Sequence, residues 1–311
     1  MSQTASAGPT NAPDPLLPIA VFDSGVGGLT VLNALMATLP HERFVYLGDT
    51  ARVPYGSKPL EMVRGFAAEI TTELLGRGVK AIVIACNTAS AASLPALADE
   101  VPVPLWGVIQ PGVDAALASL ADGDPAPGGT GVSSRTVAIL GTEATIRARA
   151  YQDRLEATGV GTWSRACPLF VPIVEEGVSD SVIARLVAEH YLDDRPPVDA
   201  VILGCTHYPL LKPVLRQILG DEVVLIDSSE AVAHAVGNDL RDQGLLCEVQ
   251  VEPVADRLTY LVTGDVGAFM NTALRLGGVE APALRVDLAA RRLAAEADGT
   301  WSRSQLPRLV S

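Results

Sequence analysis

Short runs of apolar residues alternate along the chain with longer segments in which apolar residues recur every three or four positions. The runs begin near residues 18, 43, 79, 103, 136, 200, 222 and 258, and each spans four to seven residues. Such runs are typical of strands buried on both faces of a parallel sheet, and the segments between them are typical of helices. The pattern predicts an α/β protein with parallel sheets. We expect residues 167–177 to be extended, and the chain from about residue 281 onward to be a surface helix or a disordered tail.

Several landmarks recur at nearly one spacing. At offsets of 118, 118 and 119 residues, the matching pairs are Ile19–Ser24 with Val137–Thr142, Val53-Pro54 with Val171-Pro172, and Cys86 with Cys205. Short apolar strands resemble one another, so a chance register is the alternative. The spacing favours two copies of a domain-sized unit that face each other across a pseudo-two-fold axis.

Composition narrows the class of protein. The chain has 311 residues, of which 48% are hydrophobic, so about two domains with substantial cores are expected. A net charge of −13 argues against binding to nucleic acid. We find no secretory signal and no apolar run of the ~18 residues needed to span a membrane. Four dispersed cysteines and no CxxC pair argue against a disulfide framework and a structural zinc site, which favours a soluble cytoplasmic protein with reduced thiols.

Two of the cysteines carry the candidate chemistry. Cys86 and Cys205 each end an apolar strand, which is where α/β folds place ligand-handling residues. A helix begins directly after Cys86, and its N-terminus is expected to favour a thiolate there. Two thiols that face each other can invert a stereocentre without a cofactor, because one removes a proton from carbon and the other returns a proton to the opposite face. Asp23, His207 and Glu175 are candidates to relay protons to these thiols.

Short polar side chains lie beside several predicted helix starts and next to a glycine-rich turn at residues 24–30. Such groups bind carboxylates together with backbone N–H donors, without lysine or arginine. The candidates for substrate contact are Ser24, Asn87, Thr88, Thr142, Thr145 and Thr206.

Two other classes of function are compatible with parts of this pattern. A non-catalytic protein that binds small anions would not need paired thiols. A cysteine hydrolase would use Cys205 with His207, but residues two apart at a strand end need not face each other, and Cys86 would have no role.

The chain also resembles a known family, the glutamate racemases of the aspartate/glutamate racemase superfamily, over about residues 18–275. The motifs that carry the resemblance are Phe22–Leu29, Tyr46–Thr50, Pro54–Gly56, Ala85–Ala89, Val171–Glu175 and Gly204–Pro209. The resemblance implies cofactor-independent interconversion of L- and D-glutamate, which supplies D-glutamate for peptidoglycan. A sister activity on aspartate or hydantoins is the nearest rival.

The resemblance also implies roles for individual residues. Cys86 would deprotonate the D-isomer with help from Asp23, and Cys205 the L-isomer with help from Glu175 and His207. Asp49 matches an acidic position linked to catalysis in the family. Substrate contacts would fall on Asp23, Ser24, Tyr55, Gly56, Asn87, Thr88, Thr206 and His207, with Thr142 and Thr145 as weaker candidates.

The family fold has two α/β domains with the active site in the cleft between them, and its members are commonly homodimers. By this likeness, residues 18–110 and 225–280 form the first domain, and residues 111–224 form the second. Residues 1–17 are expected to be a flexible arm. Residues 281–311 are an extension outside the family pattern.

Overall fold

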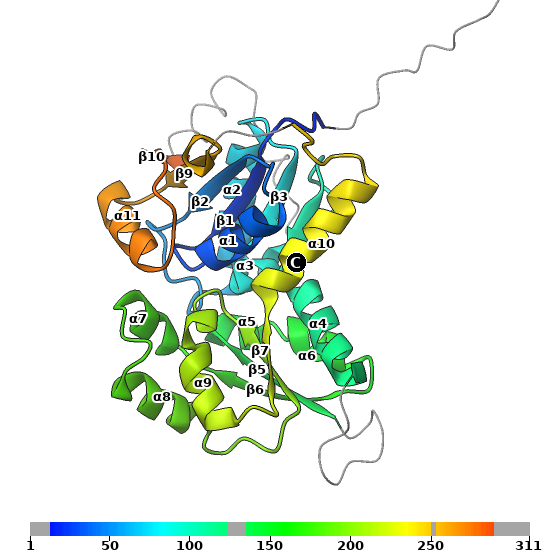
Figure 1. Ribbon diagram of the computed structural model, residues 1–311, viewed down its shortest axis with the longest axis vertical. Coiled ribbons are helices and arrows are strands. Elements are labelled where there is room, and N and C mark those ends of the chain that lie inside the picture. Colours follow the sequence, from blue (N-terminus) through cyan, green and yellow to red (C-terminus); the bar gives the residue numbers. More distant parts are fainter. Residues whose placement is uncertain (1–12, 123–134, 250–252, 289–311) are drawn as a thin grey trace, which may run out of the picture.

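The computed structural model describes residues 13–122, 135–249 and 253–288, which form two lobes built on parallel sheets (Figure 1). The sheet of the first lobe has the strand order β10 (Ala283–Arg285), β9 (Leu258–Val262), β2 (Phe44–Gly48), β1 (Ile19–Asp23), β3 (Ala81–Ile84) and β4 (Leu105–Gly107). The sheet of the second lobe has the order β6 (Gly161–Ala166), β5 (Thr136–Gly141), β7 (Ala200–Gly204) and β8 (Val224–Asp227). Every strand pair is parallel, as predicted.

Helices cover both faces of each sheet. They are α1 (Leu29–Thr38), α2 (Leu60–Leu75), α3 (Asn87–Leu97), α4 (Ile109–Asp122), α5 (Glu143–Arg147), α6 (Ala150–Glu156), α7 (Phe170–Glu175), α8 (Val182–Leu192), α9 (Lys212–Leu219), α10 (Ser228–Asp242) and α11 (Val266–Arg275). Two short 3₁₀ helices, Tyr208–Leu211 and Val254–Asp256, complete the described elements. Within the described ranges, no helix is both long enough and apolar enough to cross a membrane.

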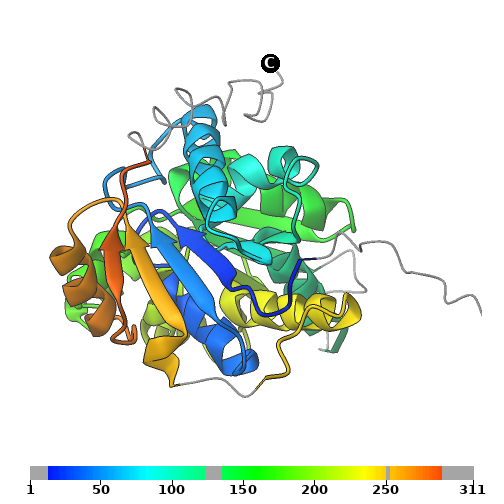
Figure 2. The same ribbon diagram turned by 90° about the horizontal axis from the view of Figure 1, so that it is seen from above.

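The central strands are continuously apolar because both of their faces are buried. In β1, Ile19 and Val21 pack with α1 and α10, whereas Ala20 and Phe22 pack with α2 and α3. Figure 2 shows α2 on one side of this sheet and α1 and α10 on the other. In β5 the same alternation directs side chains to α7, α8 and α9 on one face and to α4 and α6 on the other.

The two sheets repeat one topology. The order β2-β1-β3-β4 in the first lobe matches the order β6-β5-β7-β8 in the second. The offsets in the sequence therefore correspond to equivalent strands, and the pseudo-symmetric architecture predicted from them is confirmed.

The last helix of each unit crosses to the other lobe. Helix α4 follows β4 but packs against β7, β8 and α6 of the second lobe. Helix α10 follows β8 but packs against α1 of the first lobe. The chain thus passes between the lobes twice, and both crossings lie close to the carboxyl ends of the strands.

The structure differs from the sequence-based expectations at several elements. The expected extended segment 167–177 contains helix α7, because Pro172 falls in the first turn, where a missing N–H is tolerated. Part of the expected helical or disordered C-terminal stretch is a strand, β10, which pairs with β9 at the sheet edge. The predicted domain boundary after residue 224 falls inside β8, which pairs with β7 in the second lobe.

The two predicted terminal extensions are described only in part. Residues 1–12 and 289–311 lie outside the described residues. Residues 14–17 of the expected arm form a turn, and Lys80 Nζ donates a hydrogen bond to the carbonyl of Pro15 at 2.6 Å. The described end of the arm is therefore attached to the first lobe.

Candidate active site

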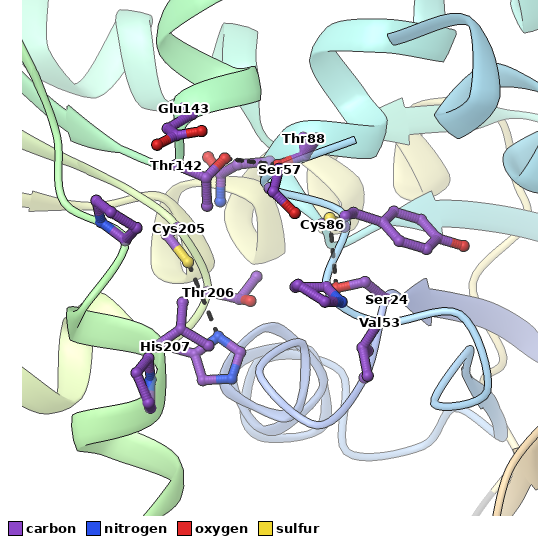
Figure 3. Close-up of a pocket in the computed structure, with 18 of the residues that line it drawn as sticks. Ser24, Val53, Ser57, Cys86, Thr88, Thr142, Glu143, Cys205, Thr206 and His207 are labelled. Atoms are coloured by element: carbon purple, nitrogen blue, oxygen red, sulfur yellow. Dashed lines mark hydrogen bonds between the residues drawn. The ribbon is translucent and has the colours of Figure 1, made fainter. Parts of the chain in front are cut away.

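A cavity of about 350 Å³ lies between the lobes and is lined by residues of both. Cys86 follows β3 and Cys205 follows β7, so the two thiols come from equivalent strand ends. Both cysteines line this one cavity, on opposite sides of the space in Figure 3. The position agrees with the general placement of ligand sites at the carboxyl ends of parallel strands.

Cys86 is the N-cap of α3, and its sulfur accepts a hydrogen bond from the N–H of Ala89 at 3.5 Å. Its thiol lies 3.9 Å from Ser24 Oγ (Figure 3). Burial raises the pKa of Cys86 to about 12, and the negative charge of Asp23 adds to this effect. The N–H of Ala89 lowers the pKa by less than burial raises it. The helix start thus favours a thiolate at Cys86, as expected, but burial has the larger effect and the net shift of the pKa is upward.

Cys205 has a basic partner. Its sulfur lies 3.8 Å from His207 Nδ1, and His207 Nε2 lies 2.9 Å from Glu175 Oε1 at the end of α7. Burial lowers the pKa of His207, but the hydrogen bonds to Cys205 and Glu175 and the charges of Cys205 and Asp23 outweigh it and raise the pKa to about 10. His207 is therefore a cation at neutral pH. Cys205 and His207 are only two residues apart, yet their side chains face each other, because the chain turns into a 3₁₀ helix directly after His207.

Asp23 lies behind the cavity, at the contact between the lobes. Its Oδ2 accepts the N–H of Gly25 at 2.9 Å, and its Oδ1 accepts the hydroxyl of Thr206 at 3.4 Å. Burial raises its pKa, although the charge of His207 and backbone N–H groups act in the opposite direction. Asp23 is therefore a stronger base than an ordinary aspartate, and its charge acts on Cys86 and on His207.

The glycine-rich turn allows the lobes to meet at this point. A Cβ on Gly27 would lie 2.3 Å from Thr206 Oγ1 and 2.5 Å from the ring of His207. A side chain at this position would have to displace Thr206 and His207, which directly follow the second thiol, Cys205. The turn therefore serves close contact between the lobes.

Asp49 does not line the cavity. It is fully buried and accepts hydrogen bonds from the hydroxyl of Tyr55, from Arg52 Nε at 2.7 Å and from Thr263 Oγ1 at 2.8 Å. Its connection to the cavity runs through Tyr55, which does line it. The structure thus places Asp49 where it positions Tyr55, rather than among the groups that could move a proton.

Most of the predicted substrate contacts lie around the cavity. These are Ser24, Tyr55, Gly56, Asn87, Thr88, Thr142, Thr206 and His207. Thr145 does not line it but closes a ring of three hydroxyls with Thr88 and Thr142, at Oγ1–Oγ1 distances of 2.9, 3.0 and 2.9 Å. This ring joins α3 of the first lobe to α5 of the second.

The comparisons with known proteins agree with this geometry. Residues 29–236 match the model of the Asp/Glu/Hydantoin racemase family. The chain is 50% identical over 266 residues to a protein of Thermus thermophilus named glutamate racemase, covering 85% of this chain and 94% of that protein. It is 42% identical over 281 residues to the glutamate racemase of Geobacter metallireducens, covering 88% of this chain and 98% of that protein. This chain belongs to the Asp/Glu/hydantoin racemase family.

Solved structures of glutamate racemases resemble this chain over most of its length. The crystal structure of Thermus thermophilus glutamate racemase with β-chloro-D-alanine matches with a TM-score of 0.77 at 50% identity, covering 88% of this chain and 98% of that chain. Glutamate racemase of Francisella tularensis with D-glutamate matches with a TM-score of 0.77 at 34% identity, covering 89% and 99%. The predicted resemblance to glutamate racemases is confirmed, and the chain is an amino-acid racemase by relationship.

Sequence reasoning missed several residues that line the racemase cavity. The additional residues are Gly25, Val53, Pro54, Ser57, Glu143, Pro168, Val171 and Pro172. The recurrence of the two Val-Pro pairs at one offset was the available signal, because equivalent positions of the two units face one cleft. Glu143 and Ser57 carried no comparable signal.

The lining of the cavity offers mostly neutral donors. Among the described residues, no lysine or arginine lines it, and His207 supplies the positive charge. No group of three or more His, Cys, Asp or Glu residues within the described ranges is arranged to hold a metal ion. Hydroxyls, amides and backbone N–H groups are therefore the donors available to a bound carboxylate.

Proposed function

We propose that this racemase interconverts L- and D-glutamate through two bases, Cys86 and Cys205. The observation that carries the proposal is that both thiols line one cavity, each from the equivalent strand end of a pseudo-symmetric lobe. The relatives named glutamate racemase, and the related structure with bound D-glutamate, support glutamate as the substrate. The size of the cavity suits a small amino acid.

In the direction from L- to D-glutamate, the thiolate of Cys205 removes the α-proton. The electron pair of the broken C–H bond delocalises into the α-carboxylate, and the thiol of Cys86 delivers its proton to the opposite face. The products are D-glutamate, a neutral Cys205 and a Cys86 thiolate. Protonated His207, 3.8 Å from the Cys205 sulfur, stabilises negative charge on it before the transfer.

In the reverse direction, Cys86 must first lose its proton. Its raised pKa makes this step costly. Asp23 is the assisting base by resemblance, and its own raised pKa fits that role. Glu175 orients His207 through the 2.9 Å contact to Nε2, so that Nδ1 faces Cys205.

Neutral donors can stabilise the carbanion-like intermediate. Charge develops on the α-carboxylate as the proton leaves, and preorganised donors in a cavity of low polarity act strongly on such charge. Asn87, Thr88, Ser24 and Thr206 are the side chains we assign to the carboxylates. Tyr55 and Gly56 complete the contacts, with Thr142 and Thr145 supporting Thr88.

The same relationship supports a proposal for the biological setting. We propose that the enzyme works without a cofactor as a homodimer in the cytoplasm and supplies D-glutamate for peptidoglycan. Multi-angle light scattering of the purified protein tests the dimer, for which a mass near twice 32.4 kDa is expected and a mass near 32.4 kDa contradicts it.

The substrate is tested by polarimetry with L-glutamate and L-aspartate in parallel. The proposal expects loss of optical rotation with glutamate and little or none with aspartate. Turnover of aspartate without glutamate would reject the assignment. Cys86→Ser and Cys205→Ser should each abolish racemisation, because one hydroxyl cannot replace the thiol as base or acid, while the circular dichroism spectrum stays that of the wild type.

A further inference from the structure

Tyr151 of α6 connects the two lobes directly behind the cavity. Its side chain is fully buried, and its hydroxyl donates a hydrogen bond to Asn87 Oδ1 at 2.7 Å. The same hydroxyl lies 3.2 Å from Ser228 Oγ at the start of α10. The first residue of α3, helix α6 of the second lobe and the crossing helix α10 therefore meet at one phenol.

The ring of Tyr151 has little freedom. A Cβ on Gly112 would lie 3.2 Å from Cε1 of the ring, and a Cβ on Gly204 would lie 3.3 Å from Cε2. The ring thus occupies a slot between two glycines, one in α4 and one directly before Cys205. A tyrosine held in this way presents its hydroxyl at a fixed point.

This contact sets the orientation of the Asn87 amide. Asn87 lines the cavity, and its Oδ1 is taken by Tyr151. Among the described residues, Nδ2 makes no hydrogen bond, so the NH₂ group is available to donate into the cavity that Asn87 lines. A flipped amide would instead turn its oxygen toward the site and repel a carboxylate.

We propose that Tyr151 is a positioning residue, which holds the Asn87 amide with its NH₂ group toward the α-carboxylate of bound glutamate. The inference deepens the proposed function and rests on it. Loss of the phenol hydroxyl leaves Asn87 in place but lets its amide rotate, which removes a donor from the carboxylate on which charge develops. Burial raises the pKa of Tyr151, so the hydroxyl remains a donor throughout the working range of pH.

A double-mutant cycle tests the inference. Tyr151→Phe, Asn87→Ala and the double variant are assayed with L- and D-glutamate by circular dichroism. We expect Tyr151→Phe to lower kcat/KM roughly five- to tenfold and Asn87→Ala at least as much, as expected for the loss of one donor. In the Asn87→Ala background, Tyr151→Phe should change kcat/KM by less than about twofold, because its target is gone.

Two control variants separate positioning from a general role in packing. Tyr260→Phe removes another buried phenol hydroxyl, which donates to the carbonyl of Val279 at 2.9 Å, and should keep activity within about twofold. Ser228→Ala keeps the bond from Tyr151 to Asn87 and should also stay within about twofold. The Ser228→Ala variant can be measured even if Tyr151→Phe does not fold.

The outcomes are distinct. Full activity of Tyr151→Phe, equal losses from it in both backgrounds, or a tenfold loss in Ser228→Ala overturns the inference while leaving the proposed function intact. A wild-type protein that does not turn over glutamate overturns both. A loss from Tyr151→Phe that disappears in the Asn87→Ala background supports the positioning role.

Discussion

From the contact between Glu175 and His207 we predict how the free energy of unfolding depends on pH. Glu175 Oε1 lies 2.9 Å from His207 Nε2, and the side chain of Glu175 is 42% exposed whereas that of His207 is 6% exposed. A hydrogen bond to a charged group contributes about 1.5–3 kcal/mol when buried, and an exposed ion pair about 0–1 kcal/mol. For this half-exposed pair we expect about 1 kcal/mol, or roughly 0.7 of a pKa unit. Glu175→Gln should lower the pKa of His207 by this amount.

The sign of the effect on stability follows from linkage. The pKa of His207 is raised from 6.5 to about 10 in the folded protein, so protonation of His207 stabilises the folded state fully below pH 6.5. That stabilisation is lost progressively as the pH rises from 6.5 to about 10. The free energy of unfolding of Glu175→Gln should therefore be lower than that of the wild type by about 1 kcal/mol at pH 6, and the gap should close near pH 10.

Urea unfolding followed by circular dichroism at pH 6, 8 and 10 measures this gap. Glu176→Gln is the matched control, since Glu176 is the exposed neighbour at the C-cap of α7 and should leave the free energy of unfolding within about 0.5 kcal/mol of the wild type at every pH. The alkaline limit of racemisation should also move to lower pH in Glu175→Gln alone. A gap of equal size at pH 6 and pH 10 would refute the reasoning, because it would not depend on the charge of His207.

Three further predictions follow from the site. Gly27→Ala should lower kcat/KM by at least about a hundredfold, since its Cβ would lie 2.3 Å from Thr206 Oγ1, and near-normal kinetics would show that the lobes need not meet so closely. Asp49→Asn should reduce the free energy of unfolding by about 2 kcal/mol in urea titrations, because it weakens three hydrogen bonds to a buried carboxylate; no change would mean that Tyr55 and its neighbours are held by packing alone. Burial raises the pKa of Cys86 to about 12, so only a small fraction of its thiol is ionised below pH 10. In a Cys205→Ser protein, the rate at which iodoacetamide alkylates Cys86 should therefore rise about tenfold per pH unit between pH 7 and 10, as followed by mass spectrometry of the Cys86 peptide. A plateau near pH 8.5 would contradict it.

The positions of the two thiols were predictable because strands buried on both faces have a strong signature. Apolar runs ending in Cys86 and Cys205 fix both residues at the carboxyl ends of parallel strands, and the offset of 119 residues relates them by the internal repeat. Identical strand order in the two sheets then brings both ends to one cleft. Local sequence suffices for this much of the fold.

Other features depend on contacts that no local pattern encodes. Helix α7, which presents Glu175, is hard to predict because prolines at 168 and 172 usually argue against a helix, but Pro168 precedes the helix and Pro172 falls in its first turn. The helix start after Cys86 is visible in the sequence, whereas the burial that raises the pKa of its thiol depends on the folded core around it. Tyr151 is 64 residues from Asn87 in sequence, so only the folded structure relates them.

Isotope exchange from solvent tests the central claim most directly. The enzyme is incubated in deuterium oxide with L-glutamate or D-glutamate separately, and both enantiomers are recovered at low conversion for mass spectrometry. With one sulfur on each face, the product should carry deuterium at the α-carbon while the recovered substrate retains protium, in both directions. Deuterium entering the recovered substrate as fast as the product would indicate a single base, and would contradict the account.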